Sequence, residues 1–176
     1  ASKLSEIFML PFSTLGVSAA TFTGQNYGAG RYDRIRTGIR DAILLSWIWS
    51  VIVIAAVYTL APVMIQLISG ATSAEVVETA RWYLRFDTPF YFVLGILIVL
   101  RNAMQGLGRK IVPMISSSIE LVGKLVVAWV LTDRMGYFGV IISEPATWIL
   151  CTILLCIMFL SDDRMRRLEC KTGHER

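Results

Sequence analysis

Residues 42–68 contain no charged side chain, and this stretch constrains the possible folds of the chain more than any other. About 20 apolar residues in a helix cross the hydrocarbon core of a bilayer, so this stretch can span it with some tilt. Trp47 and Trp49 lie near one end of it, as expected of aromatic residues at a membrane interface. The sequence therefore predicts a membrane helix here.

Four further apolar stretches have a similar character. The expected spans are residues 7–24, 42–68, 86–104, 111–131 and 137–160, and a basic tail follows at residues 161–176. Hydrophobic residues make up 55% of the chain and charged residues 17%, whereas about a quarter of a soluble domain is charged. We therefore expect an all-α integral membrane protein with five transmembrane helices that bury their apolar excess in the lipid bilayer.

Two of the apolar stretches end in the same glycine–arginine pattern. The sequence GAGR occurs at residues 28–31, with Gly24 just before it, and GLGR occurs at residues 106–109. Glycine ends helices because it adopts the left-handed conformation without strain, and arginine is costly in hydrocarbon. We expect both sequences to form the same helix stop at a membrane boundary, with Gly24, Gly28 and Gly30 all contributing to the first one.

The distribution of Lys and Arg predicts which loops share a side of the membrane. Counted outside the spans from the N-terminus, these residues number one, four, two, two, one and five. Basic residues of short loops stay in the cytoplasm, so we expect the loops at 25–41 and 105–110 and the tail to be cytoplasmic. The net charge of +4 comes from these clusters, and without an aromatic-interleaved basic face we expect no nucleic-acid partner.

Three motifs occur in a fixed order along the chain. They are GQNYGAGRYDRIRTGIR at residues 24–40, RNAMQGLGRKIVPMISSSIELVGK at residues 101–124 and GYFGVIISEPATW at residues 136–148. Through them the chain resembles the C-terminal half of the multidrug and toxic compound extrusion (MATE) family, over about residues 5–160. The order and spacing of the motifs are more specific than any one of them.

The resemblance implies an exporter of twelve helices, arranged as two six-helix lobes around a central cavity. This chain would supply helices eight to twelve, so helix seven and the N-terminal lobe would be its missing partners. The implied function is a secondary active antiporter in the plasma membrane that exports cationic or amphipathic drugs and toxic compounds, driven by Na⁺ or H⁺. The cytoplasmic tail predicted from the charge distribution agrees with this placement.

One departure from the family concerns the coupling ion. In some branches of the family, acidic residues on helices seven and ten bind this ion, but residues 93–100 in the matching helix are entirely apolar. Asp87 is the nearby carboxylate, and it lies at the outer end of the span, where we expect it at the membrane interface. That site is therefore not carried over to this chain.

Charged residues inside the predicted spans are costly in lipid and mark candidate functional positions. Glu120 and Lys124 lie four residues apart, so they share one face of a helix. Glu120 is interpreted either as a cavity-facing group that exchanges a proton or holds a cationic substrate, or as half of an internal ion pair. Glu144, which precedes Pro145, is interpreted either as a cation contact or as a charge in a watery vestibule.

Polar residues at the ends of the spans are weaker candidates. Arg101, Asn102 and Gln105 form a patch at the end of the third span, where Arg101 either reaches the lipid headgroups or contacts the other lobe as a gate. Gln25 and Asn26 follow the first span, and we expect their amides to cap helix carbonyls or to line the inner mouth of the pathway.

The sequence carries no pattern typical of an enzyme. The single histidine is His174 in the tail, and Cys151, Cys156 and Cys170 are expected to be reduced and structural. We expect no catalytic residue, no metal and no cofactor other than the coupling ion. Two alternative functions remain open at this point, which are a flippase for lipid-linked precursors and a membrane scaffold that transports nothing.

Overall fold

The computed structural model describes residues 2–69, 74–135 and 137–161, and every regular element in these ranges is helical. The elements are α1 (Ser2–Gly28), α2 (Tyr32–Ser69), α3 (Ala74–Asp87), the short 3₁₀ helix η1 (Thr88–Phe90), α4 (Tyr91–Gly106), α5 (Ile111–Met135) and α6 (Tyr137–Leu160). The predicted all-α fold is confirmed. The expected basic tail lies outside the described residues except for Ser161.

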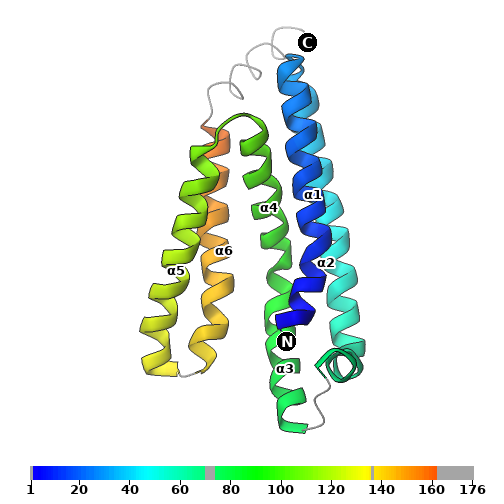
Figure 1. The fold of residues 1–176 in the computed structure, drawn as a ribbon, viewed down its shortest axis with the longest axis vertical. Helices are drawn as coiled ribbons and strands as arrows, with labels where there is room; N and C mark the ends of the chain where they lie inside the picture. Colours follow the sequence, from blue (N-terminus) through cyan, green and yellow to red (C-terminus); the bar gives the residue numbers. More distant parts are fainter. Residues whose placement is uncertain (1, 70–73, 136, 162–176) are drawn as a thin grey trace.

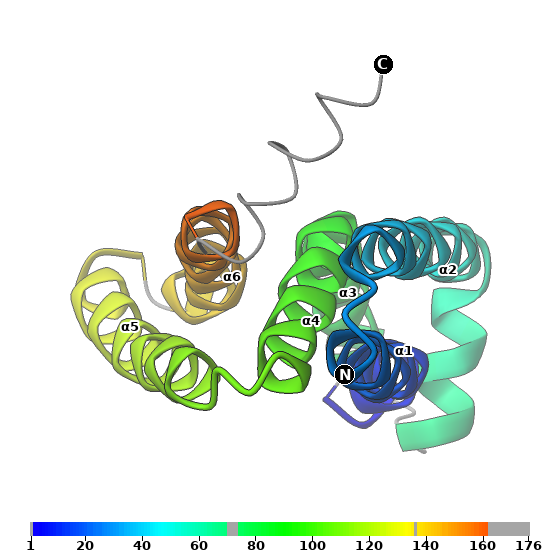
Figure 2. The ribbon, with the colours of Figure 1, turned by 90° about the horizontal axis from the view of Figure 1, so that it is seen from above.

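Helix α4 lies at the centre of the bundle. Figures 1 and 2 show it between two helix pairs, α1 with α2 on one side and α5 with α6 on the other. Its apolar side chains Leu94, Leu97 and Leu100 are among the most buried of the chain. The core of the bundle therefore follows α4 along its length.

Small residues allow α1 and α4 to approach to backbone contact. A Cβ atom added to Gly106 of α4 would lie 2.3 Å from the carbonyl oxygen of Ala20, and one added to Gly16 of α1 would lie 2.6 Å from Nδ2 of Asn102. Gly16, Ala20 and Gly24 are spaced by four residues, which places them on one face of α1. This spacing of small residues is typical of close helix contacts in membranes.

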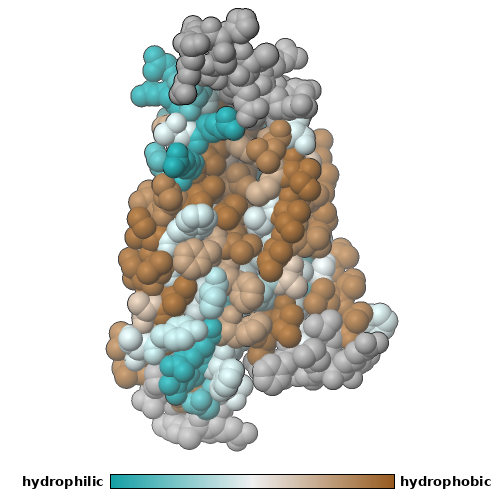
Figure 3. Space-filling view, turned by 180° about the vertical axis from the view of Figure 1, so that it is seen from behind, coloured by the Kyte–Doolittle hydropathy of each residue, from teal (hydrophilic) through white to brown (hydrophobic). Residues whose placement is uncertain are grey.

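The outer surface of the bundle is that of a membrane protein. Four stretches of the described chain are long and apolar enough to cross a bilayer, namely Ser5–Gly28, Tyr32–Leu60, Val77–Gly106 and Ile141–Leu160. Helix α5, which contains the fourth expected span, has 25 residues and exposes Leu121, Leu125 and Trp129. Figure 3 shows a band of hydrophobic side chains between more polar ends, as the hydropathy of the sequence predicts.

The helix that contains the second expected span begins well before that span. Helix α2 starts at Tyr32 rather than near residue 42, so Arg34, Arg36 and Arg40 lie within its first turns and not in a loop. Arginine is a good helix former. The negative side chain of Asp33, in the first turn, stabilises the helix by its attraction to the positive end of the helix dipole. At 1.5 Å per residue the 38 residues of α2 extend over roughly 57 Å, more than the hydrocarbon thickness.

The third expected span is interrupted near its start. Helix α3 ends at Asp87, the 3₁₀ turn η1 contains Pro89, and α4 begins only at Tyr91. Proline has no N–H group to continue an α-helical ladder, which explains a change of helix type at this position. The interruption brings Asp87 to a bend between two helices.

The two glycine–arginine sequences form the same helix stop, as predicted. Gly30 has a φ of 67° and Gly108 a φ of 77°, and these are the described glycines in the left-handed region. The amide of Arg31 donates to the Asn26 carbonyl at 2.8 Å, and that of Arg109 donates to the Met104 carbonyl at 3.0 Å. The amides of Gly30 and Gly108 donate to the carbonyls of Tyr27 and Gln105, three residues earlier in the chain. This pair of bonds at each turn defines a Schellman motif.

Gly24 and Gly28 do not share this role. Both are helical residues of α1, so our expectation that three glycines end this helix is wrong for these two. Only the residue after the helix cap must adopt the left-handed conformation, and in both turns it is the second glycine of the motif. We call the end of the bundle that carries these two turns the basic end.

We predict opposite effects for two alanine substitutions in the first turn. Gly30→Ala should destabilise the protein by about 1–2 kcal/mol, because alanine is strained at positive φ. Gly28→Ala should be neutral or stabilise by up to about 1 kcal/mol, because Gly28 is helical and open space surrounds it. Denaturant unfolding of the protein in detergent would measure both, and equal effects would contradict the assignment.

Candidate functional site

The charged side chains of the predicted spans meet on facing helices. Nη2 of Arg101 on α4 lies 2.7 Å from Oε2 of Glu120 on α5, and Nζ of Lys124 lies 3.3 Å from Oε1 of the same carboxylate. The side chain of Glu120 is 18% exposed and that of Arg101 is 21% exposed. Each oxygen of Glu120 is thus paired with a different cation, and the expected pair of Glu120 with Lys124 is present.

The pairing extends from α5 to α6 and α3. Nζ of Lys124 lies 3.9 Å from Oε1 of Glu144 on α6. The hydroxyl of Tyr83 on α3 donates to Oε2 of the same carboxylate at 3.2 Å. Four charged side chains and one phenol therefore form a continuous polar chain across the bundle, which we call the ion-pair chain: Arg101, Glu120, Lys124, Glu144 and Tyr83.

Asp87 lies close to the outer end of this chain. It is 1% exposed, so its carboxylate lies among other side chains of the bundle. It interacts electrostatically with Glu144 and Lys124. The Tyr91 hydroxyl is also near, but its approach falls short of hydrogen-bond geometry, and neither Asp87 oxygen has a hydrogen-bond partner in the described part of the chain.

These residues hold one more acidic than basic group. Asp87, Glu120 and Glu144 are three carboxylates, and Arg101 and Lys124 are two cations, which leaves one negative charge when all five are ionised. A buried charge without a partner is costly in a medium of low dielectric constant. The arrangement is therefore suited to take up one monovalent cation or one proton.

The remaining predicted residues do not join this chain. Nδ2 of Asn102 donates to the Ile98 carbonyl at 2.9 Å and Nδ2 of Asn26 donates to the Phe22 carbonyl at 2.8 Å, so both amides bond the preceding turn of their own helix. The Phe22 carbonyl lies inside α1 and not among the free carbonyls at its end, so this bond is not a helix cap. Gln25 and Gln105 are exposed at the basic end. The patch expected from Arg101, Asn102 and Gln105 is thus divided between separate environments.

Two members of the chain have partners that the sequence analysis did not identify. Tyr83 is not one of the residues that the sequence marks as a candidate, and its contact with Glu144 joins positions 61 residues apart. Arg101 reaches Glu120 and also donates to the Ser116 hydroxyl at 3.1 Å, instead of extending to lipid headgroups. No local spacing in the sequence indicates either contact.

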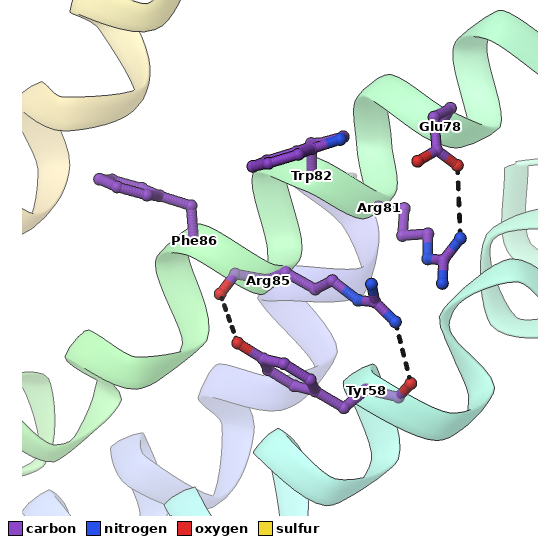
Figure 4. Close-up of a pocket in the computed structure, with 6 residues that line it drawn as sticks. All are labelled: Tyr58, Glu78, Arg81, Trp82, Arg85 and Phe86. Carbon is purple, nitrogen blue, oxygen red and sulfur yellow. Dashed lines mark hydrogen bonds and ion pairs between the residues drawn. The ribbon is translucent and has the colours of Figure 1, made fainter.

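A pocket of about 360 Å³ lies between α2 and α3, away from the basic end. Figure 4 shows Arg85 of α3 over the ring of Tyr58, with its guanidinium 5.2 Å from the ring centroid and bonded to the Tyr58 carbonyl at 3.2 Å. Glu78 pairs with Arg81 at 3.4 Å on the same helix. The contacts between Arg85 and Tyr58 attach α3 to α2, and Tyr83 joins α3 to α6 through its bond with Glu144.

Comparisons with known proteins agree with the fold and the resemblance. The family model described as MatE matches residues 1–130. The "Probable multidrug resistance protein YoeA" of Bacillus subtilis (strain 168) is 24% identical over 157 residues. A solved structure titled "Inward-facing conformation of a multidrug resistance MATE family transporter of the MOP superfamily" superimposes with a TM-score of 0.80 at 18% identity, over 99% of this chain.

The chain spans only part of these proteins. The alignment with the Bacillus subtilis protein covers 88% of this chain and 34% of that protein. The structural match covers 39% of the solved transporter. The chain therefore corresponds to somewhat more than a third of the transporter whose fold it shares.

We predict that Glu120 contributes to stability more than an exposed ion-pairing glutamate does. Glu120→Gln leaves Arg101 and Lys124 facing an uncharged amide, which should cost about 3 kcal/mol. The matched control is Glu78→Gln, because Glu78 is 58% exposed and its pair with Arg81 should contribute less than about 1 kcal/mol. Denaturant unfolding of the protein in detergent measures both changes in the free energy of unfolding. A similar small loss of unfolding free energy in the two variants would disagree with this ranking.

Proposed function

This chain belongs to the MatE family, and from that premise we propose that it forms most of one lobe of a cation-coupled exporter. The chain is a membrane transporter fragment, and its matched proteins carry multidrug resistance in their names. We propose cationic or amphipathic compounds as the exported class and H⁺ or Na⁺ as the counter-ion. The remaining helices of the transporter would supply the other half of the cavity, in the plasma membrane.

The excess carboxylate of the site is the observation that carries this proposal. A site with three carboxylates and two cations holds one positive ion at charge balance, and the ion is either the coupling ion or a cationic substrate. Because the two compete for one charge, binding of one releases the other. Such competition is the minimum that antiport requires of a binding site.

The members of the site have different roles in this proposal. Both oxygens of Glu120 are already paired, so Glu120 positions α5 against α4 and holds the two cations in place. Glu144 is held loosely, by a cation at 3.9 Å and a phenol at 3.2 Å, and Asp87 has no hydrogen-bond partner among the described residues. We propose that Asp87 and Glu144 exchange the ion, and that Tyr83 lies between them.

A flippase for anionic lipid-linked precursors is less favoured by the same charges. Such a substrate needs cations that remain available to its phosphate groups. Arg101 and Lys124 are each engaged by a carboxylate, at 2.7 Å and 3.3 Å. The ion-pair chain therefore offers an anionic substrate little net attraction.

We predict that Asp87→Asn abolishes coupling without unfolding the protein. The substitution removes one of the two carboxylates proposed to exchange the ion, together with the excess negative charge of the site. Efflux of a cationic dye from vesicles containing the full-length polypeptide should fall by more than about tenfold, and its dependence on the pH or Na⁺ gradient should disappear. Efflux of wild-type rate and ion dependence in this variant would exclude Asp87 from the exchange.

Glu120→Gln serves as the comparison, since Glu120 is assigned a positioning role. This variant also leaves two carboxylates for two cations, but it keeps Asp87 and Glu144, the groups proposed to exchange the ion. We therefore expect fewer folded molecules in the membrane, and efflux per folded molecule should be weaker but keep its dependence on pH or Na⁺. An altered ion dependence at normal abundance would instead place Glu120 among the exchanging groups. Glu78→Gln, at an exposed position of α3, controls for a general loss of negative charge.

We predict that the chain expressed alone does not export a cationic dye. Alternating access in transporters of this kind requires two bundles that move against each other, and this chain aligns with only 34% of its curated relative. Cells expressing residues 1–176 should accumulate the dye as untransformed cells do, while the full-length polypeptide lowers accumulation. Efflux by the isolated chain, with its membrane insertion verified, would contradict the half-cavity model.

A further inference from the structure

A groove of about 440 Å³ lies outside the ion-pair chain, between α2, α4 and α6 at the basic end. Its walls are Leu44 and Trp47 of α2, Ile96 and Leu100 of α4, and Cys156 and Phe159 of α6, with Arg36 and Arg40 of α2 at one end. It opens on the face drawn in Figure 3, because α2 and α6 lie on the same side of α4 in Figure 2. Its volume is within the range of small-molecule sites.

The polarity of the groove changes along α2. Arg36 and Arg40 are one helical turn apart and therefore share a face, and the next turns on that face contribute Ile43, Leu44 and Trp47. No acidic residue occurs among the described residues that line the groove. A positive end is thus followed by an apolar channel that runs toward the membrane interior.

The inner part of the groove is held in a fixed shape. Nε1 of Trp47 donates to the Phe92 carbonyl of α4 at 3.3 Å, and the two rings meet edge to face at 6.2 Å. From Arg40 to Trp47 the rise along the helix is about 10 Å. The groove therefore matches an elongated ligand with an anionic head and an apolar chain.

We propose that this groove binds an anionic glycerophospholipid. The phosphate would lie between the guanidinium groups of Arg36 and Arg40, which lie just before the charge-free residues 42–68 of α2. An acyl chain would run along Leu44 toward Trp47. Guanidinium groups pair well with phosphate, and basic pockets between membrane helices are typical sites for anionic headgroups. The two arginines disfavour the cationic compounds proposed as substrates, so this site is distinct from the transport pathway.

The lipid preference of the full-length polypeptide tests the proposal. Ligands that bind only the folded state raise the melting temperature. In a neutral detergent, we expect the rise in the melting temperature of the wild type to be several-fold larger with dioleoyl phosphatidylglycerol than with dioleoyl phosphatidylcholine. Arg36→Gln with Arg40→Gln should remove most of this difference. The matched control is Arg31→Gln with Arg34→Gln, which removes two exposed arginines of the same basic end that do not line the groove.

A second pair of variants tests the apolar channel without changing any charge. Leu44→Trp adds volume inside the groove and should also reduce the preference for phosphatidylglycerol, while Leu45→Trp should not. Leu44 and Leu45 are adjacent leucines of α2, 44% and 52% exposed, and only Leu44 lines the groove. This pair remains informative if the arginine variants are poorly expressed.

Three results would overturn the proposal. An equal loss in both arginine pairs would indicate a diffuse attraction of the basic end for anionic membranes. A full effect from inorganic phosphate in place of the lipid would indicate a simple anion site. An unchanged lipid preference in both the Arg36/Arg40 and the Leu44 variants would show that the groove is filled by another part of the polypeptide.

Discussion

The close approach of α1 and α4 is the constraint on which the rest of the bundle depends. The backbone of Gly106 contacts the backbone of Ala20, with no side chain between them, and Gly16 accommodates Asn102 one turn further along. Membrane helices gain little from hydrophobic association with each other, so a contact of this kind has to come from shape and dispersion. Once α4 is fixed against α1, its other faces are fixed as well.

Those other faces carry the two sites. Arg101 projects toward α5 and reaches Glu120, while Ile96 and Leu100 form the floor of the groove between α2 and α6. The residues that contact α1, namely Ile98, Asn102 and Gly106, occupy the third side. Helix α4 thus separates the ion-pair chain from the apolar groove. In the functions proposed above, the lipid and the transported ion therefore bind to different surfaces.

The sequence predicts those parts of the fold that depend on local spacing. The apolar stretches indicate the helices, the glycine–arginine repeats predict two identical stops, and the spacing of Glu120 and Lys124 predicts their ion pair. The contacts of Arg101 with Glu120 and of Tyr83 with Glu144 join helices whose relative rotation no local pattern specifies. Burial of Asp87 likewise follows from the bend at η1 and from α6 packing beside it, neither of which hydropathy describes.

The odd number of carboxylates has an electrical consequence. A lobe that carries one uncompensated negative charge when empty, and none when occupied, responds to the membrane potential in only one of these two states. Displacing one elementary charge through the whole potential is worth about 2.3 kcal/mol per 100 mV, and a partial displacement is worth the corresponding fraction. The step in which Asp87 and its neighbours move without a bound ion would therefore be the one that voltage accelerates or slows, while the loaded step would be electrically silent.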